Sequence, residues 1–205
     1  MRLRVERTLR ALRTDRIDVL HLHAVSPRQY PLAVERVVPE LRKLKEEGKL
    51  RAIGITEAFT KDPHHQMLQK AVADASVDTI MIGFNPNNRS AAETVIPAAQ
   101  QQGIAVVGMF AARGLHGLPP GDTSKLSAIV DDAGMPSLHA LAYRYCRHQP
   151  GMHVILTGTS NPEHLQQNIA GVLAPPLSPA ILERLRAWSP DTITRTKDRP
   201  ENDCR

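Results

Sequence analysis

Short runs of β-branched and other apolar residues alternate along this chain with segments in which apolar residues recur every three or four positions. The apolar runs predict strands, and the 3.6-residue periodicity predicts helices. Strands are expected at Ile17–Leu22, Arg51–Ile55, Asp78–Ile82, Ile104–Gly108 and His153–Leu156. Helices are expected at Val34–Glu47, Pro63–Ala75, Ala91–Gln102, Ser137–Arg147, Pro162–Val172 and Pro179–Trp188. This strict alternation favours parallel strands with helical crossovers.

Glycine, proline and cap residues mark where these elements end. Gly48 and Gly103 each follow a helical segment, as glycine caps do. Ser160-Asn161-Pro162 places a cap donor before a proline at a first helical turn. Arg113–Thr123 is rich in glycine and proline and is predicted to be a loop.

The chain is predicted to form a single domain over residues 1–188, followed by a polar tail at 189–205 without periodicity, expected to be disordered or to lie on the surface. The 205 residues fall at the low edge for an α/β barrel. The five expected strands are fewer than the eight of a closed barrel. We therefore expect an α/β fold that forms only part of a (β/α)8 barrel.

Composition indicates a cytoplasmic protein. No apolar run approaches the ~20 residues of a membrane span, so no membrane association is expected. The start of the chain lacks the apolar segment of a secretory signal. Cys146 lies in a predicted helix and Cys204 in the polar tail. This placement favours free thiols over a disulfide framework. Neither His64 and His65 nor His139 and Cys146 have the spacing and third ligand of a metal site, so no metal is expected.

The whole chain carries a net charge of +5, and part of this excess is concentrated in basic residues near its start. They are Arg2, Arg4, Arg7, Arg10, Arg13 and Arg16. Leu3, Leu9 and Leu12 interleave with them, as expected for a solvated helix with one apolar stripe. No aromatic stacking residues lie nearby, so we expect no nucleic-acid binding.

Several segments, in unbroken order, resemble the aldo/keto reductase family. Asp18–His23 and Leu41–Ile55 (LRKLKEEGKLRAIGI) resemble the centre of its barrel. Gly103–Val107 resembles its seventh strand, and Val154–Leu165 (VILTGTSNPEHL) resembles its eighth strand and cofactor helix. The resemblance implies strands four to eight of a (β/α)8 TIM barrel. It also implies descent from enzymes that reduce aldehydes and ketones by hydride transfer from NADPH.

The resemblance places His23 at the position of the histidine that orients the substrate carbonyl. A strand's C-terminal end is where barrel enzymes carry catalytic groups. The alternative for His23 is a histidine packed at the barrel mouth without a catalytic role. His21 lies two residues earlier on the same face, so it is expected inside the barrel as a hydrogen-bonded core histidine.

For the nicotinamide, the family usually offers a serine and an asparagine, where this chain has Thr56 and Glu57. Its glutamine and its stacking tyrosine align with Met81 and Met109. Phe110 follows Met109 and is expected to point to the opposite face in a regular strand. The resemblance thus implies altered nicotinamide contacts, and we expect nicotinamide binding to be impaired.

For the adenosine phosphates, the resemblance implies that Gly158, Thr159 and Ser160 precede a helix N-terminus suited to a phosphate. His164 aligns with a frequent arginine, and Asn168 with an asparagine that meets adenine. The alternative is simply a capped helix start. The implied cofactor is NADP(H), and we expect its binding to be impaired.

The family's catalytic tyrosine, aspartate and lysine belong to segments before the strand at Ile17, and only sixteen residues precede it here. Tyr30 is a weak candidate substitute. We therefore expect little or no reduction of a small carbonyl substrate by this length of chain. Alternatives are a non-catalytic regulatory protein on the same fold, a truncated gene model and a decaying fragment. Exposed barrel edges are expected to favour self-association.

Overall fold

A computed structural model describes residues 1–115 and 118–188. Within them, five parallel strands form one sheet in the order β1-β2-β3-β4-β5. The strands are β1 (Ile17–Val25), β2 (Leu50–Glu57), β3 (Thr79–Gly83), β4 (Ala105–Met109) and β5 (Val154–Ile155). Each predicted strand is confirmed, and their sequential order is that of five consecutive strands of a (β/α)8 barrel.

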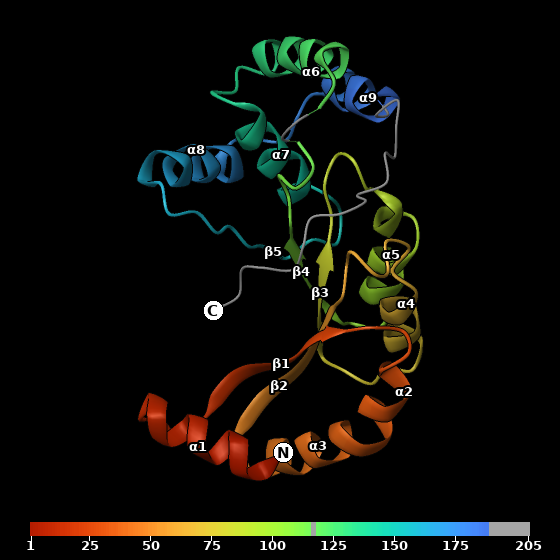
Figure 1. Cartoon of the computed structure of the whole chain (residues 1–205), viewed down its shortest axis with the longest axis vertical. Helices are drawn as coiled ribbons and strands as arrows, with labels where there is room; N and C mark the ends of the chain where they lie inside the picture. Colours follow the sequence, from red (N-terminus) through yellow and green to blue (C-terminus); the bar gives the residue numbers. More distant parts are fainter. Residues whose placement is uncertain (116–117, 189–205) are drawn as a thin grey trace.

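Helices follow the strands and cover one face of the sheet (Figure 1). They are α1 (Arg2–Leu12), α2 (Tyr30–Leu32), a π-helical turn (Ala33–Val37), α3 (Val38–Glu46), α4 (Gln66–Ala73), a 3₁₀ turn (Ser90–Ala92), α5 (Val95–Gln101), α6 (Pro120–Asp132), α7 (Leu138–Arg147), α8 (Pro162–Leu173) and α9 (Pro179–Ala187). Within residues 1–115 and 118–188, no helix is long and apolar enough to cross a membrane.

The core lies between the sheet and these helices. Ile53, Ile55, Ile80, Ile82 and Val106 point toward the helices and are at most 2 % exposed. The opposite face, which would line a barrel, is much more open. Val19 at one end and Val154 at the other are 44 % and 49 % exposed. Among the described residues β1 pairs only with β2, and β5 only with β4, so both outer strands have a free edge.

Predicted element ends agree well where glycine and asparagine caps set them. Gly48 and Gly103 adopt φ of +75° and +67° after α3 and α5. The Asn161 side chain accepts a hydrogen bond from the Glu163 N–H at 2.9 Å and caps α8.

Three sequence expectations are wrong. The loop prediction at Arg113–Thr123 overlooked α6, which begins at Pro120, because a proline at a first helical turn starts a helix as readily as it belongs to a loop. Leu3 and Leu12 are 80 % and 63 % exposed, and Val5 instead joins Leu9 as the buried stripe of α1.

The third difference concerns the single helix expected at Val34–Glu47, which is loosened into a π-helical turn before α3. Pro39 has no N–H to donate to the carbonyl of Glu35, and this removes one α-helical hydrogen bond at the transition. The predicted tail at 189–205 lies outside the described residues.

Candidate functional site

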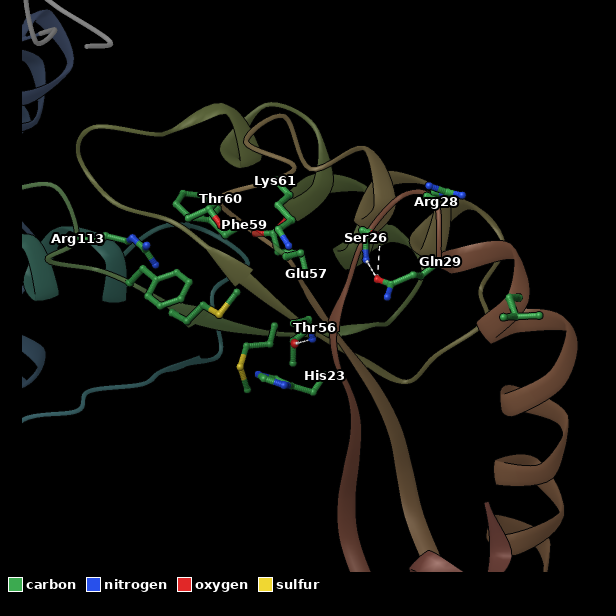
Figure 2. A pocket seen from close by; sticks show the side chains of 16 residues that line it. His23, Ser26, Arg28, Gln29, Thr56, Glu57, Phe59, Thr60, Lys61 and Arg113 are labelled. Carbon is green, nitrogen blue, oxygen red and sulfur yellow. Dashed lines mark hydrogen bonds between the residues drawn. The ribbon is translucent and has the colours of Figure 1, made fainter. Parts of the chain in front are cut away.

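Two adjoining pockets lie where the strands end, at the edge where barrel enzymes carry their sites. The first, of about 800 Å³, lies over the ends of β1 to β4 and is shown in Figure 2. The second, of about 600 Å³, lies between the end of β4 and helices α7 and α8. Four residues line both and join them into one cleft: Met81, Met109, Phe110 and Arg113.

His23 lines the first pocket from β1, as the sequence predicted (Figure 2). His23 is exposed rather than packed into the core. This exposure leaves its side chain accessible from the pocket, and its catalytic role stays a prediction. His21 lies over the inner face, and a Cβ on Gly54 would stand 2.3 Å from its ring. Its Nε2 is buried without a hydrogen-bond partner among the described residues, so the expected core hydrogen bond is missing at that atom.

Thr56 fixes the backbone beside His23. The pairing of β1 with β2 shifts by one residue between Leu22 and Val25, and Ala24 there adopts φ of +51°. The Ala24 N–H donates to Thr56 Oγ1 at 2.6 Å. The Thr56 hydroxyl lines the first pocket and keeps its own hydrogen for donation. It therefore both holds the bulge and can donate a hydrogen bond into the pocket.

Glu57 lines the first pocket, but other groups engage both of its oxygens. Oε1 accepts from the Gly83 N–H at 2.7 Å, and Oε2 lies 2.8 Å from His65 Nδ1. Both side chains are fully buried. Desolvation raises the pKa of Glu57, while His65 and the Gly83 amide oppose that shift. Sequence reasoning missed this pair, because His65 stands at a predicted helix start and was interpreted as an ordinary surface or packing residue.

Phe110 enters the cleft, so the expectation that it points away is wrong. Strand β4 ends at Met109, and Phe110 adopts φ of +66°, which turns its side chain out of the strand alternation. Its ring lies 5.7 Å from that of Phe59, and the Arg113 guanidinium lies 4.6 Å from its centroid. This aromatic wall between the two pockets was missed because the strand was taken to continue.

Tyr30 is excluded as a proton donor in the cleft. Its side chain is 1 % exposed, and its hydroxyl contacts Asp74 Oδ2 at 3.0 Å and Ser76 Oγ at 2.9 Å. Burial raises its pKa to about 12. It does not line either pocket, so its role is to tie α2 to the end of α4.

The second pocket gathers four of the predicted cofactor residues: Gly158, Thr159, His164 and Asn168. Asn168 is 5 % exposed and donates from Nδ2 to Thr157 Oγ1 at 2.9 Å. Its Oδ1 is buried and has no partner among the described residues. An orphaned buried acceptor facing a pocket fits a ligand donor such as the amino group of adenine.

Ser160 does not line either pocket, in contrast to its predicted neighbours. Thr159 lines the second pocket from this loop, and its Oγ1 accepts a hydrogen bond from the Asn161 N–H at 3.1 Å. His164 stacks against His139 with ring centroids 6.3 Å apart. Within residues 1–115 and 118–188, no three His, Cys, Asp or Glu side chains are grouped to hold a metal ion.

Known proteins similar to this chain show which family it belongs to. The model of the aldo/keto reductase family matches residues 1–117 of the 205. This chain belongs to the aldo/keto reductase family. Its resemblance by motif is thereby confirmed, as is the partial barrel, since solved reductases share its fold.

Two such structures illustrate the fold. An aldo-keto reductase of Bacillus halodurans in its apo form superposes with a TM-score of 0.72 at 23 % identity, covering 95 % of this chain and 70 % of that protein. An aldo/keto reductase of Klebsiella pneumoniae in complex with NADP and acetate gives 0.68 at 24 % identity, covering 91 % and 63 %.

In sequence, the chain is similar to L-galactose dehydrogenase of Arabidopsis thaliana. The two are 26 % identical over 181 residues, which are 82 % of this chain and 56 % of that enzyme. This member of the aldo/keto reductase family thus spans little more than half the length of that relative.

Proposed function

We propose that this chain binds NADP(H) and carries part of the site of a carbonyl oxidoreductase. The observation that carries the proposal is one continuous cleft. His23 lies at one end, and at the other lies Asn168 Oδ1, which has no hydrogen-bond partner among the described residues. When bound, the nicotinamide cofactor supplies the hydride. His23 would hydrogen-bond the carbonyl oxygen of a small aldehyde or ketone, and Phe110 would offer its face to a ring.

Binding is expected to depend on the second pocket. There Asn168 presents an acceptor, and Gly158 and Thr159 precede the N-terminus of α8, which favours phosphate. The first pocket offers the Thr56 hydroxyl, whereas Glu57 is occupied by His65 and Gly83. We therefore expect weaker nicotinamide contacts than in a reductase with a free amide at that position.

Turnover by this 205-residue chain is expected to be weak or absent. No tyrosine lines the first pocket among the described residues, so His23 lacks the proton donor that the family places beside it. A non-catalytic regulatory role would share this expectation, and His23→Ala separates the two. Any aldehyde-dependent oxidation of NADPH that is lost in this variant would establish an enzyme. We also propose a cytoplasmic location, consistent with the free thiol of Cys146.

Calorimetric titration with NADPH and with adenosine 2′,5′-bisphosphate tests cofactor binding. Both ligands should bind, with affinities within about tenfold of each other, because most contacts lie at the adenosine end. Asn168→Ala should weaken both about tenfold by removing its hydrogen bonds. Gln167→Ala, on the same helix but outside the pocket, is the matched control. Failure of either ligand to bind the folded chain would overturn the proposal.

A further inference from the structure

A smaller pocket lies away from the cleft, between the C-terminal half of α7, the segment that follows α8, and helix α9. We call it the α7–α9 pocket. Its volume is about 160 Å³, and it shares no lining residue with the first or second pocket. An apolar cavity of about 150 Å³ can hold one benzene ring. The α7–α9 pocket therefore fits a molecule of that size and is too small for a dinucleotide such as NADPH.

Arg144 lines this pocket as a buried cation without an anionic partner among the described residues. It is 9 % exposed, and its guanidinium donates to the carbonyl oxygens of Pro175 at 2.6 Å, Ala133 at 3.0 Å and Pro176 at 3.4 Å. Carbonyl oxygens satisfy its N–H groups but do not neutralise its charge. In the described part of the chain, no carboxylate lines the pocket. An uncompensated buried charge is unfavourable, so the adjoining space favours an anion.

Tyr145 supplies a donor whose partner is missing. It lines the pocket and is 7 % exposed, and its ring stacks on that of Phe84 with centroids 5.7 Å apart. Its hydroxyl hydrogen-bonds to no residue in the ranges 1–115 and 118–188, although a buried tyrosine hydroxyl usually finds a partner. Burial raises the pKa of Tyr145, and the charges of Arg89 and Arg186 oppose that shift. The hydroxyl is therefore protonated at neutral pH and lies in the field of two cations.

Arg186 is the exposed cation of the pocket. It lies on α9 one turn after Leu182, which also lines the pocket. Its side chain forms no ion pair with a described residue, whereas Arg184, two residues earlier, pairs with Asp132. The Arg89 guanidinium donates to the carbonyl oxygen of Arg186 at 3.1 Å, so a further positive charge lies beside it. Cations that converge from separate elements raise the local concentration of anions.

We propose that the α7–α9 pocket binds a small carboxylic acid with an apolar body. A guanidinium matches a carboxylate through two parallel N–H donors, which Arg186 can offer, and the Tyr145 hydroxyl adds a third donor. The apolar body would pack against Leu177 and Leu182, which line the same pocket. This ligand is distinct from the cofactor and the carbonyl substrate of the cleft.

The test compares benzoate with benzyl alcohol, which keeps the ring and removes the charge. Each is titrated into the isotope-labelled whole chain, and amide shifts are followed by NMR. Benzoate should bind at least about tenfold more tightly, because its hydrogen bonds are charge-assisted, and should shift signals of α7 and α9. Arg186→Gln and Tyr145→Phe should each weaken benzoate about fivefold and leave benzyl alcohol unchanged. Neither change removes a side-chain hydrogen bond within the described chain, so both variants should fold.

Arg184→Gln is the matched control, because Arg184 is exposed on the same helix but lies outside the pocket. It should leave the benzoate affinity unchanged, and Arg186→Lys should recover part of the loss seen with glutamine. Saturating adenosine 2′,5′-bisphosphate should not displace benzoate, since the pockets share no residue.

Three outcomes would overturn the site: equal binding of benzoate and benzyl alcohol, an equal loss in the Arg184 variant, or displacement of benzoate by the bisphosphate. Inorganic phosphate that binds as tightly as benzoate would show a site for any anion and overturn the carboxylic acid class.

Discussion

The paired side chains of Glu57 and His65 are the most consequential residues of the site that local sequence could not reveal. Their pairing at 2.8 Å supports the pocket floor, and the backbone of His65 at φ of +58° is held in a strained conformation. Strained φ values at Ala24, His65 and Phe110 all lie around the first pocket. Three of the five non-glycine residues with positive φ in the described part of the chain thus lie at or next to this cavity.

A double-mutant cycle measures the coupling of this pair. His65→Ala should destabilise the chain by about 3 to 5 kcal/mol, because it leaves the buried Glu57 carboxyl without its His65 partner. The same change in a Glu57→Gln background should lower the free energy of unfolding clearly less. The difference between the two losses measures the coupling, because the contribution of the His65 backbone is the same in both backgrounds and cancels. His64→Ala, one residue earlier and exposed, should stay within about 0.5 kcal/mol. Equal costs in both backgrounds, measured by urea unfolding, would show that the pair is not coupled.

The pH dependence of stability has a defined sign at Glu57. Its pKa in the folded chain is raised above the usual 4.5, so the folded state binds the proton more tightly than the unfolded state. The Glu57 contribution is fully present below about 4.5 and is lost as pH rises through the folded pKa. Glu57→Gln should therefore gain stability relative to the parent as pH rises from about 4.5 toward neutrality.

Among the helices, close contact is set by single glycines. A Cβ on Gly171 of α8 would lie 2.2 Å from the carbonyl oxygen of Ala140 on α7, whereas one on Gly121 of α6 would meet nothing within 4 Å. Gly171→Ala should therefore cost about 1 to 3 kcal/mol by forcing α7 and α8 apart. Gly121→Ala should be neutral or stabilising by up to about 1 kcal/mol through helix propensity. Thermal unfolding of the two variants provides the comparison, and equal effects would contradict the packing argument.

Because α8 carries Asn168, its displacement should also reach the second pocket. Gly171→Ala is expected to weaken NADPH binding, whereas Gly121→Ala should not. The packing of α8 against α7 thus affects the position of Asn168 in the proposed cofactor site.

Within residues 1–115 and 118–188, the sheet has two unpaired edges and an open inner face. Edge strands with exposed apolar side chains promote pairing between chains. We propose that a second copy of the chain covers this face. Each copy carries the same exposed strands, so two copies can associate through the same surface. The weight-average sedimentation coefficient should then rise with protein concentration.

Val19→Lys together with Val154→Lys should suppress this rise, because both side chains are exposed on the open face. Leu3→Lys, on α1 and 80 % exposed, serves as the control for charge alone. A concentration-independent monomer for the parent chain would refute self-association.

The alternation of strands and helices, the family and the position of His23 could be predicted from the amino-acid sequence, because apolar periodicity and cap residues act locally. The sequence also brought Gly158, Thr159, His164 and Asn168 to one place, since they belong to one strand–helix turn. The pairing of Glu57 with His65, the turn of Phe110 into the cleft and the burial of Tyr30 became visible in the folded chain alone. These depend on contacts between separate elements and on backbone angles that neighbouring residues do not specify.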